Sequence, residues 1–403
     1  MNRPDLLQML STRCAERERS GLLRRLRTFE HVRGAHVRVG DRELLGFCSN
    51  DYLGLAQDAR VIAALKRAAD ECGAGGASAH LICGHRHEHA MLEEELADWT
   101  GRKRALLFSS GWLANLGAMQ ALLDGDGVCV QDKLNHASLL DAAKLAGGKL
   151  RRYPHADVAG AARQLDASPD APALLASDGV FSMDGDVAPL RELATLCRRE
   201  NATLMIDDAH GLGVLGPEGA GSVAAAGLAQ DEVPVLMATL GKAVGGMGAF
   251  IAGNDALIDG LTQFARSYVY TTASPPALAA ATLAAVRIVR SEDSRREKLA
   301  AMIARFRAGA SQLGLPLADS STPIQPILLG DAGTTSAVSR ALEARGLLVT
   351  AIRPPTVPAG AARLRVTLSA AHEEADIDRL LDALAQAMPI EGAAQKQAAA
   401  GAD

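Results

Sequence analysis

The chain has 403 residues, of which 22% are charged and 48% hydrophobic, and its formal net charge is −5 at pH 7. This is the composition of a globular protein long enough for two domains, and the absence of a long basic run argues against nucleic acid or an anionic membrane as partner. Six scattered cysteines without a CxxC pair, a charged N-terminus and no apolar run as long as a membrane span lead us to expect a soluble cytoplasmic protein.

The first 50 residues are predicted to form an N-terminal segment outside the main core. Residues Leu6 to Arg27 have the pattern of a charged amphipathic helix. A small hairpin is expected next, with strands at 36–39 and 44–47 around a Gly40-Asp41 turn.

From Tyr52 to about residue 285, short apolar runs alternate with helical patterns. These runs include residues 105–108, 127–130, 173–176, 204–206 and 235–237. Strands that are apolar throughout and separated by helices indicate a mainly parallel sheet covered on both faces, with its active site at the carboxyl ends of the strands. We therefore predict a large domain over residues 51–285.

A smaller α/β domain is predicted over residues 286–390. The charged helix 291–307 leads into it, strand-like runs lie at 324–329 and 363–368, and a helix at 373–388 closes it. The tail 391–403 is rich in Ala, Gly and Gln and is predicted to be disordered.

Lys242 lies in a turn of small residues, 239–246, directly after an apolar run. Upstream, the run 204–206 ends in Asp207, and His210 follows three residues later. This order suits pyridoxal 5'-phosphate (PLP), because a lysine can form a Schiff base with the aldehyde. The acid can keep the pyridine nitrogen protonated, so that the ring acts as an electron sink. His210 is placed to hydrogen-bond the phenolic oxygen.

Two other strand ends carry groups that a PLP site needs. Ser110, Gly111 and Trp112 follow a strand and start a helix, where backbone amides can cradle a phosphate with help from the Ser110 hydroxyl. His136 follows another strand and is expected over a flat ring. A polar loop, residues 177–186, follows a third strand.

The segment 85–89 carries three alternating histidines, a pattern that resembles a metal-binding site. Alternating side chains share one face only on a strand, however, and this segment leads into a predicted helix at 90–99. We expect the glycine-rich stretch 73–84 to be part of the active-site entry, and we predict no metal site.

Several motifs together carry a resemblance to a known family. They are SNDYLGL at 49–55, LEEELA at 92–97, GVFSMDGD at 179–186, DDAHG at 207–211, GK at 241–242, AIRPPTVPAG at 351–360 and ARLR at 362–365. With these motifs the chain resembles the α-oxoamine synthases of the fold-type I PLP superfamily, from about Leu22 to Met388. Within that family it is most similar to the biotin-biosynthetic branch.

The resemblance implies a large domain with a mainly parallel seven-stranded sheet flanked by helices, and a smaller C-terminal α/β domain. It implies PLP as cofactor and a decarboxylative condensation of L-alanine with pimeloyl-CoA or pimeloyl-acyl carrier protein. It also implies a homodimer whose two active sites share residues across the interface.

The resemblance assigns roles at matching positions. Lys242 is the Schiff-base lysine and the acid/base at the substrate α-carbon. His136 stacks on the ring and is our candidate proton donor to the thioester oxygen, Asp207 pairs with the ring nitrogen, and His210 contacts the phenolic oxygen. The further cofactor-binding positions are Ser110, Gly111, Trp112, Ser182, Thr239 and, from the partner subunit, Thr271 or Thr272. The substrate-binding positions are Asn50 and Arg365 for the amino-acid carboxylate, Arg24 or Arg25 for the acyl carboxylate, and Thr356.

Three positions depart from the family pattern while keeping its chemical character: Trp112 replaces Phe or Tyr, and Asp178 and Asp208 replace Glu. A glycine-using sister enzyme (2-amino-3-ketobutyrate CoA ligase or 5-aminolevulinate synthase) stays open, because the choice between alanine and glycine depends on one or two methyl contacts. A non-catalytic partner subunit is disfavoured by the presence of Lys242. A dinucleotide-binding protein is set aside because no G-x-G-x-x-G follows the first strand.

Overall fold

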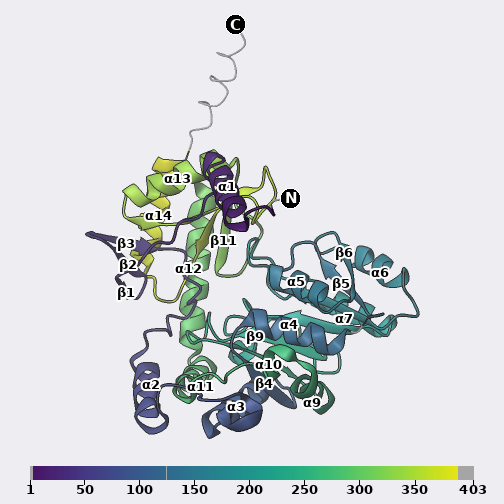
Figure 1. The fold of residues 1–403 in the computed structure, drawn as a ribbon. Helices are drawn as coiled ribbons and strands as arrows, with labels where there is room; N and C mark the ends of the chain where they lie inside the picture. Colours follow the sequence, from purple (N-terminus) through teal and green to yellow (C-terminus); the bar gives the residue numbers. More distant parts are fainter. Residues whose placement is uncertain (1–2, 124, 389–403) are drawn as a thin grey trace.

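The computed structural model describes residues 3–123 and 125–388, so the tail predicted at 391–403 lies outside the described residues. The chain forms a large α/β domain and a smaller domain above it in the view of Figure 1. Among the residues described, no helix has the length and apolar character needed to cross a bilayer.

A seven-stranded sheet is the centre of the large domain. Its spatial order is β4-β10-β9-β8-β7-β5-β6, and only β10 runs antiparallel to its neighbours. The strands are β4 (Arg104–Phe108), β5 (Val128–Asp132), β6 (Lys149–Tyr153), β7 (Ala173–Asp178), β8 (Thr203–Asp207), β9 (Val235–Thr239) and β10 (Ala249–Gly253). The predicted mainly parallel, seven-stranded sheet is therefore confirmed.

Helices cover both faces of this sheet because successive side chains of a buried strand point to opposite faces. On β8, Leu204 and Ile206 pack on one side while Met205 packs on the other. The helices of the large domain are α2 (Ala59–Cys72), α3 (His87–Trp99), α4 (Gly111–Leu122), α5 (Ala137–Leu145), α6 (Val158–Asp166), α7 (Leu190–Arg199), α8 (Ser222–Ala225), α9 (Asp255–Phe264), α10 (Arg266–Val269) and α11 (Pro276–Ser291). A π-helical turn (His80–Gly84) and a 3-10 turn (Pro217–Gly219) complete it.

The small domain is built around the antiparallel sheet β11-β14-β13. The long helix α12 leads into it from the large domain (Figure 1). Its elements are α12 (Asp293–Gln312), β11 (Ile324–Gly330), α13 (Ala332–Ala344), β12 (Leu347–Leu348), β13 (Thr350–Ile352), β14 (Ala362–Thr367) and α14 (Glu374–Ala387). One apolar core includes Leu364 and Leu380 of this domain together with Leu107 and Phe250 of the large sheet.

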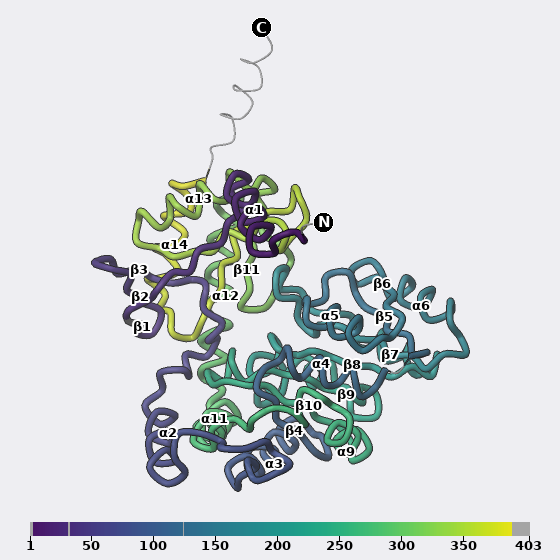
Figure 2. The backbone as a smooth tube through the Cα atoms, viewed as in Figure 1, coloured from purple at the N-terminus to yellow at the C-terminus, as the bar shows by residue number. Residues whose placement is uncertain are grey.

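The N-terminal segment lies beside the C-terminal part of the chain, as the tube in Figure 2 shows. The predicted hairpin is confirmed as β2 (His36–Val39) and β3 (Arg42–Gly46), with β1 (His31–Arg33) added at one side. Strand β3 pairs in parallel with β12, so the N-terminal segment and the small domain share a sheet. The domain boundaries at residues 50, 285 and 390 stay predictions.

The N-terminal helix is shorter than the sequence pattern indicated. Helix α1 covers Leu6–Arg19, with the Asp5 side chain accepting hydrogen bonds from the amides of Leu7 and Gln8. The predicted end at Arg27 is wrong, because the chain turns at Ser20 and Gly21 has φ +65°, a left-handed conformation that stops a helix at little cost for glycine.

Candidate active site

The predicted site residues gather at the carboxyl ends of parallel strands. Asp178 and Asp207 end β7 and β8 and are direct register partners, and Lys242 follows β9 after three residues. A cavity of about 220 Å³ opens there. Eight of the predicted residues line it: Gly111, Trp112, His136, Ser182, Asp207, His210, Thr239 and Lys242. Residues far apart in sequence meet because parallel strands bring their carboxyl ends to one edge of the sheet.

Lys242 is partly buried and contacts His210 directly. Its Nζ lies 2.8 Å from Nε2 of His210. Burial lowers the pKa of Lys242 to about 8, the Arg365 charge acts in the same direction, and Asp207 and Asp178 oppose both. At pH 7 about a tenth of this amine is therefore unprotonated, far more than for a solvated lysine, and the unprotonated form is the one that attacks an aldehyde or takes a proton.

A chain of hydrogen bonds continues from His210. Burial holds the pKa of His210 well below its usual range, so the ring is neutral and accepts from Lys242 through Nε2. Its Nδ1 then carries the proton and lies 2.6 Å from Oη of Tyr52. Tyr52 in turn donates to Oδ1 of Asn50 at 3.3 Å. The sequence pattern included Tyr52 only as part of a motif and did not identify it as a site residue.

Asp207 is buried among neutral partners. Its Oδ2 accepts from the Asn115 side-chain amide at 2.8 Å, and its Oδ1 accepts from the backbone N–H of Ala209 at 3.1 Å. Neither partner is charged, so this carboxylate can still pair with a cation that enters the cavity. Asn115, a second residue that the sequence pattern did not identify, also donates to Ser138 at 2.8 Å.

Asp178 is buried beside Asp207, its register partner on the neighbouring strand. Burial, with a further contribution from the neighbouring Asp207, raises the pKa of Asp178 well above the usual value. Its Oδ2 accepts the backbone N–H of His136 at 2.9 Å, which fixes the start of α5. Asp178 thus positions His136.

His136 and Trp112 form one side of the cavity. Their ring centroids are 6.4 Å apart at an interplanar angle of 81°. Nδ1 of His136 lies 2.8 Å from the hydroxyl oxygen of Ser138. Burial lowers the pKa of His136, and the nearby Lys242 contributes in the same direction. A neutral imidazole at this position can stack on a ring and exchange a proton.

The start of α4 offers backbone amides to an anion. Ser110 is its N-cap, and the Ser110 hydroxyl accepts from the amide of Leu113 at 3.3 Å. The first amides of the helix, at Gly111 and Trp112, border the same cavity. The hydroxyl of Thr239 donates to the carbonyl of Gly248 at 3.0 Å.

Arg365 connects the substrate-binding candidates. Its Nε donates to the carbonyl of Ser182 at 2.6 Å, and its Nη1 donates to the Thr367 hydroxyl at 3.0 Å. Both terminal nitrogens lie 3.4 Å from Oδ1 of Asn50. Asn50 therefore joins the hydrogen-bond chain from Lys242 to Arg365.

The remaining predicted residues lie apart from this cavity. Arg24 donates to the Thr356 hydroxyl at 3.3 Å, which brings those two positions together. Arg25 instead pairs with Glu18 at 2.7 Å and is exposed. Thr271 and Thr272 do not line the cavity, and Thr272 forms a bridge with Ala79. Their predicted role across a dimer interface stays a prediction.

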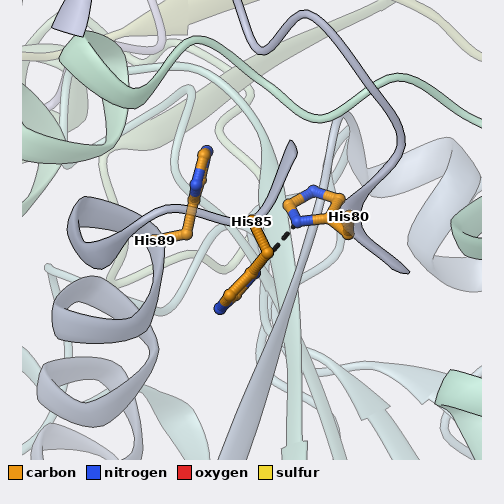
Figure 3. Close-up of side chains that lie close together, drawn as sticks. All are labelled: His80, His85 and His89. Atoms are coloured by element: carbon orange, nitrogen blue, oxygen red, sulfur yellow. Dashed lines mark hydrogen bonds between the residues drawn. The ribbon is translucent and has the colours of Figure 1, made fainter. Parts of the chain in front are cut away.

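Three histidines do come together near the start of α3, but they are His80, His85 and His89 rather than the alternating set (Figure 3). Nδ1 of His80 and Nδ1 of His85 lie 3.1 Å apart. Nδ1 of His89 accepts the amide of Arg86 at 3.0 Å, and its Nε2 lies 2.9 Å from the Ser274 carbonyl. Both ring nitrogens of His89 are therefore hydrogen-bonded to backbone groups.

Comparison with known proteins places this site in a family context. The family of class I and II aminotransferases matches residues 42–384. An 8-amino-7-oxononanoate synthase from Xanthomonas campestris pv. campestris (strain B100) is 55% identical over 391 residues, 97% of this chain and 98% of the relative.

Solved structures agree with that similarity. A structure of serine palmitoyltransferase with PLP superposes with a TM-score of 0.91 at 28% identity, covering 95% of this chain and 98% of that one. An 8-amino-7-oxononanoate synthase from Francisella tularensis superposes with a TM-score of 0.75 at 30% identity, covering 85% and 97%.

Proposed function

The chain belongs to the class I and II aminotransferase family and, within it, to the 8-amino-7-oxononanoate synthases, and we propose that it condenses L-alanine with a pimeloyl thioester in biotin biosynthesis. The products are 8-amino-7-oxononanoate, CO2 and free CoA or acyl carrier protein. The enzyme is PLP-dependent, as its family and its structural neighbours are.

The observation that carries the proposal is the hydrogen-bond chain from Lys242 through His210 and Tyr52 to Asn50 and Arg365. It joins an amine with a lowered pKa to a buried guanidinium whose charge acts on that amine. An amino acid needs both groups, because its carboxylate binds a guanidinium while its α-proton is removed by a base.

The residues present fit PLP. Asp207, which accepts hydrogen bonds from the neutral Asn115 side chain and the Ala209 amide, would pair with a protonated ring nitrogen, and His136 would lie against the ring face. The amides at the start of α4 would hold the phosphate, and Lys242 would hold the aldehyde carbon. When bound, the cofactor supplies an electron sink for the substrate α-carbon.

Individual side chains of the protein would bind the substrates and transfer protons. Arg365 and Asn50 would bind the L-alanine carboxylate, and the unprotonated amine of Lys242 would take the α-proton. The neutral ring N–H of His136 would donate a hydrogen bond to the thioester carbonyl oxygen as the carbon–carbon bond forms. Arg24 and Thr356 would face the distal carboxylate of the acyl chain, with Arg25 the less favoured of the two arginines because it pairs with Glu18.

The assembly and location follow as further parts of the proposal. We infer a homodimer in which Thr271 or Thr272 reaches the partner's phosphate site. Leu81, Ile82 and Tyr270, which are 48%, 78% and 73% exposed, support an interface on that side of the monomer. A cytoplasmic location agrees with the six free cysteines.

The visible absorption spectrum of the PLP-loaded protein tests this function. We expect a band that changes with L-alanine, and release of CoA or carrier protein when the matching pimeloyl thioester is added. A response to glycine alone would move the assignment to a glycine-using sister enzyme. A protein with no such band after addition of PLP would contradict the proposal.

A further inference from the structure

His155 lies between two carboxylates outside the cavity. It follows β6 by two residues, and its Nδ1 is 3.2 Å from each carboxylate oxygen of Asp132 at the end of β5. Its Nε2 is 2.9 Å from Oδ2 of Asp186. Asp132 is almost fully buried, and Phe181 contacts the imidazole edge-on with 4.4 Å between ring centroids.

This arrangement requires a charged imidazole. Each ring nitrogen faces a carboxylate, so both must donate, and only the imidazolium can do so. The hydrogen bonds to Asp132 and then Asp186 raise the pKa of His155 to about 10, although burial opposes them. His155 is therefore a permanent cation across the neutral range that ties two acids together.

Asp186 ends a tight loop that begins at Val180. Val180 and Val187 form an antiparallel bridge, the amide of Phe181 donates to the Asp186 carbonyl at 3.0 Å, and the amide of Gly185 donates to the Phe181 carbonyl at 2.8 Å. Because the loop closes on itself, a contact at Asp186 fixes the position of the whole loop.

The other side of the loop holds Arg365. The carbonyl of Ser182 accepts from Nε of Arg365 at 2.6 Å. The carbonyl of Gly185 also accepts from Ser320 and Thr322 of the small domain, at 2.8 and 2.9 Å. The loop therefore connects β5 of the large domain, through His155, to β14 of the small domain, through Arg365.

We propose that His155 is a positioning residue for Arg365: by clamping the 180–187 loop to β5 it sets the orientation of the guanidinium and hence the affinity for the amino-acid carboxylate. The inference rests on the proposed function and names a further residue that sets substrate affinity. The sequence does not indicate that these residues meet, since Asp132 ends β5, His155 follows β6 and Asp186 lies in the loop after β7.

His155→Gln is the first test, because glutamine keeps one hydrogen bond and removes the positive charge. The PLP-loaded protein is titrated with L-alanine, and the dissociation constant is read from the cofactor's visible absorption. We expect a rise of about tenfold, with an unchanged cofactor content and an unchanged KM for pimeloyl-CoA. His87→Gln, the same change at an exposed histidine of α3, is the matched control and should behave as wild type.

A double-mutant cycle separates positioning from general loosening. In an Arg365→Lys background the planar guanidinium is absent, so His155→Gln should weaken alanine binding by less than about twofold. If His155→Gln does not fold, Asp186→Asn breaks only the loop side of the clamp, and a rise of about threefold is expected.

Two results would overturn the inference. One is an alanine dissociation constant for His155→Gln within about twofold of wild type; the other is the same loss in both backgrounds. The proposed function fails in a different way, because wild-type protein would then give no response to L-alanine.

Discussion

Nζ of Lys242 lies 2.8 Å from Nε2 of His210 at the carboxyl edge of the sheet, where His210 is buried and Lys242 partly buried. A buried amine beside a neutral imidazole is easier to deprotonate than a solvated lysine. The pH dependence of Lys242 reactivity is therefore the most direct consequence of this geometry.

The pKa of about 8 at Lys242 predicts how fast PLP binds to the cofactor-free protein. Only the unprotonated amine attacks the aldehyde, so the second-order rate constant should rise almost tenfold per pH unit well below pH 8 and level off above it. A solvated lysine, with its ordinary pKa of 10.5, would instead keep gaining rate up to about pH 10. Stopped-flow absorbance measures the rate, with the exposed Lys144→Ala as control. A rate that levels off only near pH 10 would contradict the lowered pKa.

Tyr52→Phe should lower the stability of the protein, because it removes one hydroxyl group from the hydrogen-bond chain. It deletes the hydroxyl 2.6 Å from Nδ1 of His210 and leaves that buried nitrogen without its partner. An unpaired buried polar group costs about 1–3 kcal/mol of unfolding free energy. Urea denaturation of the cofactor-free protein measures this loss, and the comparison is Tyr153→Phe at a fully buried tyrosine that does not line the cavity. A loss below about 0.5 kcal/mol would argue against the hydrogen-bond chain.

The sequence predicted those parts of the site that depend on chain order. Asp207 and Lys242 follow apolar runs that become β8 and β9, and adjacent parallel strands bring their carboxyl ends together. Periodicity also predicted the alternation of strands and helices and the hairpin, because burial on both faces leaves a pattern along the chain. The predicted end of α1 was wrong, since the helical pattern continues past Gly21 while the backbone does not.

Contacts between residues from separate segments of the chain leave no periodic pattern in the sequence. His155 meets Asp132 and Asp186 only after three strands have been placed, and His80 joins His85 and His89 through a π-helical turn. Tyr52 and Asn115 were missed for the same reason, because their partners lie far away in sequence. Local spacing cannot report such contacts.

Glu93 predicts a pH dependence of stability away from the active site. Its Oε1 accepts the amide of Leu107 at 2.9 Å, and burial raises its pKa to about 7, above the ordinary value of 4.5. A carboxyl with a raised pKa in the folded state favours folding when protonated. That stability is fully present below pH 4.5 and is lost as the pH rises through about 7.

Glu93→Gln should remove this loss. Glutamine keeps an acceptor for Leu107 and carries no charge, so we expect the variant to exceed wild type by about 1–3 kcal/mol at about pH 8 and to differ little at about pH 5. Urea denaturation at both pH values measures the difference. Glu94→Gln on the same helix is the control, and an equal effect at the two pH values would contradict the assignment.

Arg24 and Arg25 allow the acyl side of the site to be tested with adjacent residues. The Arg24 side chain hydrogen-bonds Thr356 in the 353–358 loop, whereas the Arg25 side chain is exposed and pairs with Glu18. If Arg24 meets the distal carboxylate of the acyl chain, Arg24→Ala should raise the KM for pimeloyl-CoA by about three- to tenfold, because a charged hydrogen bond is lost at an exposed site. Arg25→Ala should leave that KM unchanged, and the KM for L-alanine should be the same in both variants. A heptanoyl thioester, which lacks the distal carboxylate, should show no difference between wild type and Arg24→Ala. Equal losses in both arginine variants would place the acyl carboxylate elsewhere.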